Sequence, residues 1–174
     1  TVAEPMTSRD SIEGHESVPL ARCHVARLPR SSPSTPAEVR RLGLSFREAS
    51  LPATLASVLR EHGELDFSRL PRFEDDDAWF LAEIPALEGE GRRVLVLEGL
   101  ATLARVFVND RLVLESTNAF LRHEVDVTEL LRGDDVLAMH FASLDAHLAE
   151  KRPRPRWKTR IVESQNLRFV RTPL

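Results

Sequence analysis

The chain has 174 residues, 42% of them hydrophobic, and a formal net charge of -3 at pH 7. This length is about one domain's worth and is too short for a (β/α)8 barrel, which needs about 250 residues. The near-neutral charge and the dispersed basic residues argue against a nucleic-acid-binding protein.

The first half of the chain predicts short elements separated by breaks. Residues 1–17 are polar and lack periodicity, so we expect a tail or extension there, followed by a single domain over residues 18–174. A strand is expected between Val18 and Pro29. Thr35, with proline after it and glutamate three positions on, forms a capping box that predicts a short helix over 37–42.

A second helix is indicated by apolar residues at helical spacing, namely Leu51, Leu55, Val58 and Leu59. Ser50 is the expected N-cap of this helix, and a glycine at position 63 stands where the helix should end. The acidic run 74–77 follows. It lacks the alternate spacing and turn glycine of a calcium loop, so a solvated loop is expected.

From Trp79 onward the pattern is typical of strands. Short runs rich in β-branched and aromatic residues are separated by turn formers; they cover 79–84, 93–98, 104–108, 111–114 and 136–141, and Val125 and Val127 alternate with acids. Asn109-Asp110 predicts a tight hairpin turn with primed geometry. Strands joined by short loops predict an all-β antiparallel sandwich with one or two short helices. The basic, proline-rich run 151–156 predicts an extended loop.

Several polar residues are expected to serve turns rather than chemistry. Asp126 and Thr128 are expected to cap the short turn that runs through Leu131. Asp134 and Asp135 are expected to lie in a loop. None of these carboxylates is assigned a catalytic role.

The stretch from Leu97 to Asp110 resembles the strand, turn and strand of the N-terminal sugar-binding domain of glycoside hydrolase family 2. Further segments resemble its β-mannosidase-like branch in the same order; they are 51–63, Trp79-Phe80, Asn118-Ala119-Phe120 and 123–143. The resemblance covers roughly Leu44 to Asp145. Ala53 and Asp110 depart from it, because the family usually has glycine at both positions.

This resemblance implies a jelly-roll sandwich of the galactose-binding type that supports and partly closes the active site of a neighbouring barrel. The family places both catalytic carboxyl groups on that barrel, so the chain by itself is expected to be inactive, as an accessory domain of a retaining, β-mannosidase-like exo-glycosidase. Three alternatives stay open: a self-sufficient carbohydrate-binding module, the same domain of a β-galactosidase or β-glucuronidase, and a purely structural or interaction domain.

The resemblance also implies candidate site residues. In related enzymes the loop equivalent to 115–120 reaches the barrel mouth, where its asparagine meets the sugar, which makes Asn118 and its neighbour Phe120 substrate-binding candidates in the complete enzyme. A turn-stabilising asparagine is the competing interpretation. Trp157 and Trp79 are weaker sugar-stacking or interface candidates, and a tryptophan within an apolar strand such as Trp79 is more often part of a core.

No cofactor or metal site is expected, because the histidines are scattered and none has zinc-finger spacing with Cys23. The single cysteine excludes an intrachain disulfide and is expected to be a buried thiol. The expected partners are a β-mannoside or related β-glycoside and the enzyme's own downstream sandwich and barrel domains, with no nucleic acid and no membrane. No secretion signal or membrane span is visible, so a cytoplasmic location is the default, and a periplasmic or secreted one stays open if the N-terminus was trimmed.

Overall fold

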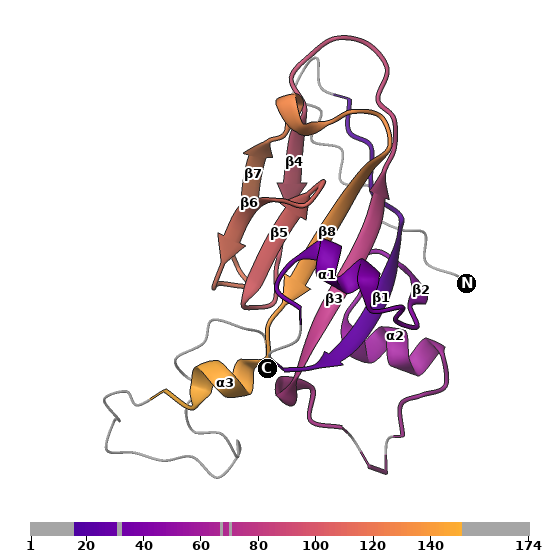
Figure 1. Cartoon of the computed structure of the whole chain (residues 1–174), viewed down its shortest axis with the longest axis vertical. Coiled ribbons are helices and arrows are strands. Elements are labelled where there is room, and N and C mark those ends of the chain that lie inside the picture. The colour runs from indigo at the N-terminus through magenta and orange to yellow at the C-terminus, as the bar shows by residue number, and fades with distance from the viewer. Residues whose placement is uncertain (1–15, 31–32, 67, 70, 151–174) are drawn as a thin grey trace, which may run out of the picture.

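The computed structural model describes residues 16–30, 33–66, 68–69 and 71–150, and it is built from two antiparallel sheets (Figure 1). The larger sheet has six strands in the order β2-β1-β3-β8-β5-β6, and the smaller one pairs β4 with β7. The strands are β1 (Arg22–Pro29), β2 (Arg47–Ser50), β3 (Asp76–Ile84), β4 (Val94–Leu97), β5 (Ala104–Val108), β6 (Arg111–Ser116), β7 (His123–Asp126) and β8 (Asp135–Phe141). The expected all-β antiparallel sandwich is therefore confirmed.

The main core lies between the two sheets. Phe80 on β3, Val106 on β5 and Leu137 on β8 are buried there, and Leu95 of β4 and Val125 of β7 pack against them from the smaller sheet. Alternate residues along a strand point to opposite faces, so one face of each strand supplies this core.

The outer face of the larger sheet is also covered. Trp79, Phe107 and Leu28 form a second buried cluster there with Val39 of helix α1 (Pro36–Arg41). Because β3 is buried on both faces, its sequence is almost continuously apolar from position 78 to 82 instead of alternating.

The helices are short. The capping box at Thr35 is confirmed, since its side chain accepts from the Glu38 backbone N–H and the Glu38 side chain accepts from Thr35 N. Besides α1 there are α2 (Leu55–Glu61), α3 (Leu144–Leu148) and two 3-10 turns, η1 (Phe73–Asp75) and η2 (Thr128–Leu130). Within these described ranges, no helix has the length and apolar character needed to cross a membrane.

The N-cap expected for the second helix was wrong. Ser50 is the last residue of β2, and α2 begins only at Leu55 with Thr54 as its N-cap. Thr54 Oγ1 accepts from the Ser57 N–H at 3.1 Å, and Ser57 Oγ accepts from the Thr54 N–H at 3.0 Å. The cause is Pro52, because the residue before a proline is disfavoured in the helical region.

Two acidic residues expected in loops are buried at the starts of strands. Asp77 is 4% exposed as the second residue of β3, so the run 74–77 is not a solvated loop. Asp135 is 5% exposed as the first residue of β8, where its carboxylate accepts from the backbone N–H groups of Arg132 and Gly133 at 2.8 to 2.9 Å. A buried carboxylate persists when such donors surround it.

The hairpin turn between β5 and β6 is confirmed. Asn109 and Asp110 have φ values of 49° and 70°, the left-handed conformation that a primed turn requires at both central positions. Asn109 also accepts from the Val136 N–H at 3.0 Å and donates to Asp135, which ties the turn to β8. Asp110 pairs with Arg40 of α1.

Candidate functional site

The loop between β6 and β7 is closed by a small hydrogen-bonded framework. Ser116 Oγ lies 3.1 Å from His123 Nε2, which joins the last residue of β6 to the first residue of β7. Inside this closure, the backbone N–H of Asn118 donates to Ser116 Oγ at 3.4 Å. The loop therefore has a defined shape without a helix or strand of its own.

The side-chain amide of Asn118 makes a hydrogen bond within the loop through its oxygen atom. Its Oδ1 accepts from the Phe120 backbone N–H at 3.1 Å, which is the hydrogen bond of an Asx turn. Among the described residues, the Asn118 Nδ2 group has no hydrogen-bond partner. The turn-stabilising hydrogen bond is thus present in the structure, and it leaves both N–H donors of Nδ2 available.

Phe120 lies at the tip of the same loop and is 68% exposed, with Leu121 beside it 49% exposed. The backbone under this tip is closely packed, because Ala119 is buried and its carbonyl oxygen lies 3.3 Å from where a side chain on Gly99 would begin. An exposed apolar pair on a fixed backbone suits a docking surface, since little ordering is needed when it binds.

Arg122 follows the apolar tip and is held by acids on the smaller sheet. Its guanidinium lies 2.9 Å from the Glu124 carboxylate and 4.0 Å from that of Glu98. These side chains are well exposed, so the pairs contribute little to stability. Acidic and basic side chains therefore lie beside the exposed apolar residues Phe120 and Leu121.

The two tryptophan candidates have different outcomes. Trp79 is fully buried, stacked on the His140 ring at 4.6 Å and on Phe107 at 5.9 Å between centroids. A buried ring offers no face to a sugar at the surface, so Trp79 is a core residue. Trp157 lies outside the described residues, as does the basic run 151–156.

A buried polar cluster on the outer face of the larger sheet was not anticipated from the sequence. Arg105 Nη2 lies 3.1 Å from His140 Nδ1, and His140 Nε2 lies 3.1 Å from Asp77 Oδ2. A guanidinium can only donate, so Nδ1 is the acceptor and the ring hydrogen is on Nε2, directed at Asp77. The only sequence signal for this cluster was a polar residue within an apolar strand run, Arg105 in 104–108 and His140 in 136–141.

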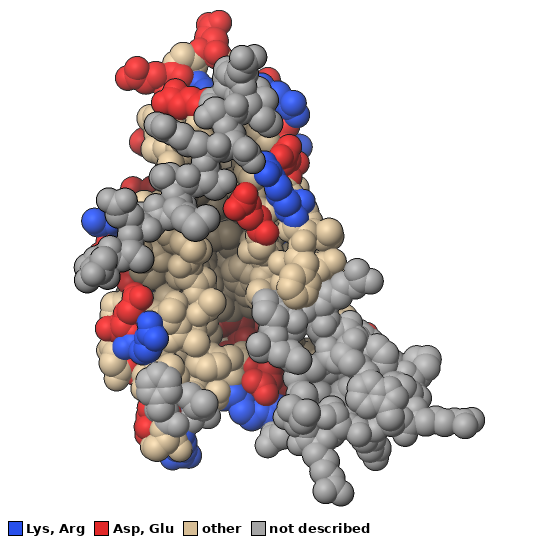
Figure 2. Space-filling view, turned by 180° about the vertical axis from the view of Figure 1, so that it is seen from behind, with Lys and Arg blue, Asp and Glu red and all other residues tan. Residues whose placement is uncertain are grey.

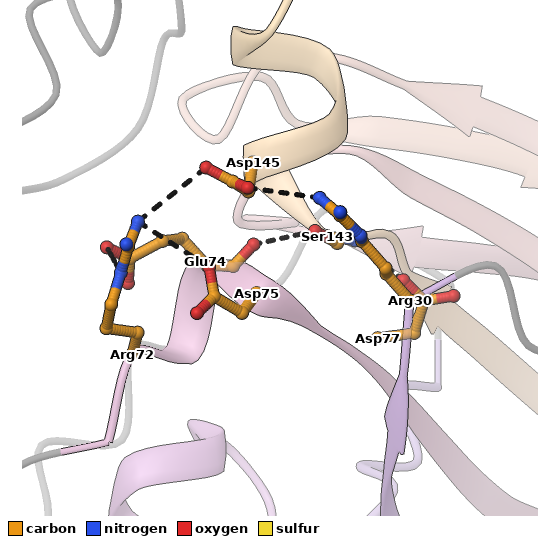
Figure 3. Close-up of polar contacts among 7 residues, drawn as sticks. All are labelled: Arg30, Arg72, Glu74, Asp75, Asp77, Ser143 and Asp145. Atoms are coloured by element: carbon orange, nitrogen blue, oxygen red, sulfur yellow. Dashed lines mark hydrogen bonds and ion pairs between the residues drawn. The ribbon is translucent and has the colours of Figure 1, made fainter.

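Asp77 also anchors the segment after β8. The Ser143 backbone N–H donates to Asp77 Oδ1 at 2.8 Å, and the Ser143 hydroxyl donates to the Glu74 carbonyl at 2.7 Å. Figure 3 shows Asp145, two residues after Ser143, reached by Arg30 at 3.1 Å and by Arg72 at 3.6 Å. These contacts fix α3 against η1 and the end of β1, which is a structural role.

Asp126 is committed to a turn, as expected. Its Oδ1 accepts from the Thr128 hydroxyl at 2.7 Å and from the Thr128 backbone N–H at 3.1 Å, at the start of η2. Hydrogen bonds from Thr128, and then from Arg92, lower the pKa of this carboxyl to about 2. Such a group stays ionised at neutral pH and is a poor general acid.

Surface charge and the single thiol offer no second site among the described residues. On the back face, acidic and basic side chains lie near one another without a patch of one sign in the part of the chain that is described (Figure 2). Burial raises the pKa of the Cys23 thiol to about 11, so this cysteine is unreactive, in agreement with the expected buried thiol. Groups of three or more potential metal ligands are absent from the residues described.

The chain matches the family described as glycosyl hydrolase 2 galactose-binding domain-like over residues 48–173. It belongs to this family. The resemblance inferred from the strand, turn and strand at 97–110 is thereby confirmed, and the galactose-binding-like fold agrees with the two antiparallel sheets described above.

Curated relatives of this galactose-binding-like domain include two fungal proteins named β-mannosidase B. The protein from Aspergillus terreus is 36% identical over 94 residues, which cover 49% of this chain and 11% of the relative. The protein from Emericella nidulans is 31% identical over 114 residues, covering 60% and 13%. The chain thus spans about a tenth of the length of these relatives.

Solved structures show the same fold. The β-D-mannosidase from Dictyoglomus thermophilum superposes with a TM-score of 0.64 at 17% identity, over 87% of this chain and 18% of that one. The exo-chitosanase CsxA from Amycolatopsis orientalis superposes with a TM-score of 0.53 at 16% identity, over 72% and 16%. At such identities the likeness concerns the architecture of the galactose-binding-like domain.

Proposed function

We propose that this domain is an accessory part of a retaining exo-glycosidase acting on β-mannosides, and that it supports and shapes the active site of a catalytic barrel outside this chain. The observation that carries the proposal is the family membership together with relatives named β-mannosidase B, of which this chain corresponds to about a tenth. Retaining hydrolysis needs two carboxyl groups about 5 to 5.5 Å apart, and the proposal assigns both to the barrel.

The loop at 117–122 is the part of the domain that we assign to the substrate. Asn118 Oδ1 already accepts from the Phe120 N–H, whereas Nδ2 has no partner among the described residues, so we assign the contact with a sugar to a donation from Nδ2 to a hydroxyl oxygen. Phe120, exposed beside it, supplies an apolar face against the sugar ring or the barrel wall. This geometry combines the two interpretations of Asn118, because one amide atom stabilises the turn while the other is available to bind.

The test compares this chain with the complete enzyme that contains it. Isothermal titration of the 174-residue chain with mannose and short β-mannosides is run beside hydrolysis of an aryl β-mannoside by the complete enzyme. We expect hydrolysis by the complete enzyme, and neither hydrolysis nor saturable binding by the chain alone. An inactive complete enzyme would contradict the proposal.

A second candidate function is a self-sufficient carbohydrate-binding module, favoured by an exposed aromatic ring, Phe120, in the same loop as an amide donor, Asn118 Nδ2, that has no partner among the described residues. Saturable binding of a mannoside by the chain alone would support it. A panel of aryl β-galactoside, β-glucuronide and β-mannoside substrates, tested on the complete enzyme, separates the branches of the family. Preferred hydrolysis of the β-mannoside is expected.

A further inference from the structure

The loop that carries Asn118 crosses from the larger sheet to the smaller one, and a side-chain contact joins its two ends (Figure 1). Ser116 is the last residue of β6 and is buried, whereas His123 is the first residue of β7 and is half-buried. Ser116 Oγ lies 3.1 Å from His123 Nε2. This contact holds the ends of the loop at 117–122 together across the gap between the two sheets.

The partners of Ser116 assign the hydrogen of this contact. Ser116 Oγ lies 3.4 Å from the backbone nitrogen of Asn118 and 3.3 Å from its carbonyl oxygen. A backbone N–H only donates and a carbonyl oxygen only accepts, so the hydroxyl hydrogen is directed at the carbonyl and one lone pair receives the N–H. The other lone pair is left for His123 Nε2, which carries a hydrogen when all three contacts are hydrogen bonds. His123 is therefore the donor that holds Ser116.

Asn118 lies between two held points of the chain. On one side, Ser116 contacts both backbone polar groups of Asn118. On the other side, Ala119 is buried, and its carbonyl oxygen lies 3.3 Å from where a side chain on Gly99 would begin. A group held in place before its ligand arrives needs less ordering on binding. The side-chain amide of Asn118 thus projects from a backbone that the two sheets fix together.

We infer that His123 is a positioning residue for the sugar contact, which rests on the proposed function, in which Asn118 meets the substrate. His123 acts through Ser116 by holding the backbone of Asn118 where its Nδ2 donates to a sugar hydroxyl. A misplacement of about 1 Å in such a group can lower activity by about a hundredfold, even when the residue that causes it lies away from the chemistry. A side chain that does not touch the sugar can therefore change kcat/KM.

The first test measures hydrogen exchange of the loop amides in the 174-residue chain. His123→Leu keeps a side chain that can pack in a half-buried site and removes the donor. The matched control is His62→Leu, because His62 Nε2 lies 2.9 Å from the carbonyl oxygen of Glu48 on β2, at the opposite edge of the larger sheet from β6. We expect the backbone amides of Asn118 and Phe120 to exchange about tenfold faster in His123→Leu and at an unchanged rate in His62→Leu. Equal exchange in the two variants would overturn the inference, whatever Asn118 does in binding.

The second test measures kcat/KM of the complete enzyme with an aryl β-mannoside. His123→Leu should lower kcat/KM by about fivefold, and His123→Gln, which retains an N–H donor, should restore it to within about twofold of the unchanged enzyme. Asn118→Asp should lower kcat/KM by about tenfold in the unchanged enzyme, but by less than about threefold in combination with His123→Leu, because the amide is then no longer held at the sugar. A purely structural role of His123 would not produce this coupling.

A failed sugar contact and a failed positioning role give different results. If Asn118→Asp left kcat/KM unchanged in the otherwise unchanged enzyme, the proposed sugar contact would be wrong and the role of His123 would fall with it. If Asn118→Asp lowered kcat/KM by the same factor with and without His123→Leu, the sugar contact would stand and only the positioning role would be overturned. Low activity of His123→Gln, equal to that of His123→Leu, would overturn it as well.

Discussion

At the scale of single residues, Asn118 separates a turn role from a binding role. Asn118→Asp keeps an oxygen that accepts from the Phe120 N–H and loses the Nδ2 donor, whereas Asn118→Ala loses both. We expect Asn118→Asp to lower kcat/KM of the complete enzyme by about tenfold, the effect of one lost hydrogen bond, with an unchanged free energy of unfolding. The measurement is aryl β-mannoside kinetics beside urea unfolding. Normal kinetics in Asn118→Asp with a destabilised Asn118→Ala would leave only the turn role.

The buried cluster makes a second prediction at this scale. Asp77→Ala leaves the His140 Nε2–H and the Ser143 N–H without their acceptor in a buried site. We expect the free energy of unfolding to fall by about 3 kcal/mol. Exposed Asp134 provides the matched control, because Asp134→Ala should change it by less than about 0.5 kcal/mol. Urea unfolding measures the free energy of unfolding of both variants. Equal losses in Asp77→Ala and Asp134→Ala would mean that the cluster does not stabilise the domain.

At the scale of secondary-structure elements, the start of α2 distinguishes two possible caps. Thr54→Ala removes a reciprocal capping box and should lower the free energy of unfolding by about 1 kcal/mol. Ser50→Ala, on an exposed residue at the end of β2, should lower it by less than about 0.5 kcal/mol. Thermal or urea unfolding measures both. A larger loss in Ser50→Ala would contradict the structure at this helix.

The turn before β8 predicts a pH dependence. Burial raises the pKa of Asp135, but hydrogen bonds from Asn109 and from the backbone N–H groups of Gly133 and Arg132 outweigh it, so the net shift is downward from 3.8. A lowered pKa in the folded state contributes stability above the unfolded value, and that contribution is lost as the pH falls through the folded value.

Asp135→Asn should therefore show a smaller difference in the free energy of unfolding between pH 6 and about pH 2.5 than the unchanged chain. Urea titrations at the two pH values measure this difference. Asp134→Asn, next to it and exposed, should retain the full difference. An unchanged pH dependence in Asp135→Asn would show that another group dominates acid unfolding.

At the scale of the whole molecule, Phe120 tests whether the domain docks in a larger enzyme. Phe120 is 68% exposed, so Phe120→Asp should change the free energy of unfolding of the 174-residue chain by less than about 0.5 kcal/mol. In the complete enzyme, the same change should lower both the melting temperature and kcat/KM, because a charge is then placed in a dry contact. Leu42→Asp, at a second exposed apolar residue, is the control. If Phe120→Asp lowered the melting temperature and kcat/KM of the complete enzyme no more than Leu42→Asp does, docking through this loop would be contradicted.

The sequence determined the features whose causes are local. The strand runs after Trp79, the primed turn at Asn109-Asp110 and the capping box at Thr35 each depend on a few consecutive residues, and all are present in the fold. The order of these segments along the chain was also sufficient to indicate the family, which the match over residues 48–173 confirms. The loop at Asn118 followed from the same ordered pattern, while its role in binding stays a prediction.

Only the tertiary structure decided which side chains meet across the sheets. His140 contacts Asp77, which is 63 positions away in the sequence, and no local pattern predicts that these two residues meet or that both are buried. The same holds for the full burial of Trp79, which depends on α1 covering the outer face of the larger sheet. Pairing between distant strands sets which face of each strand is covered, and it thereby separates core aromatics such as Trp79 from exposed ones such as Phe120.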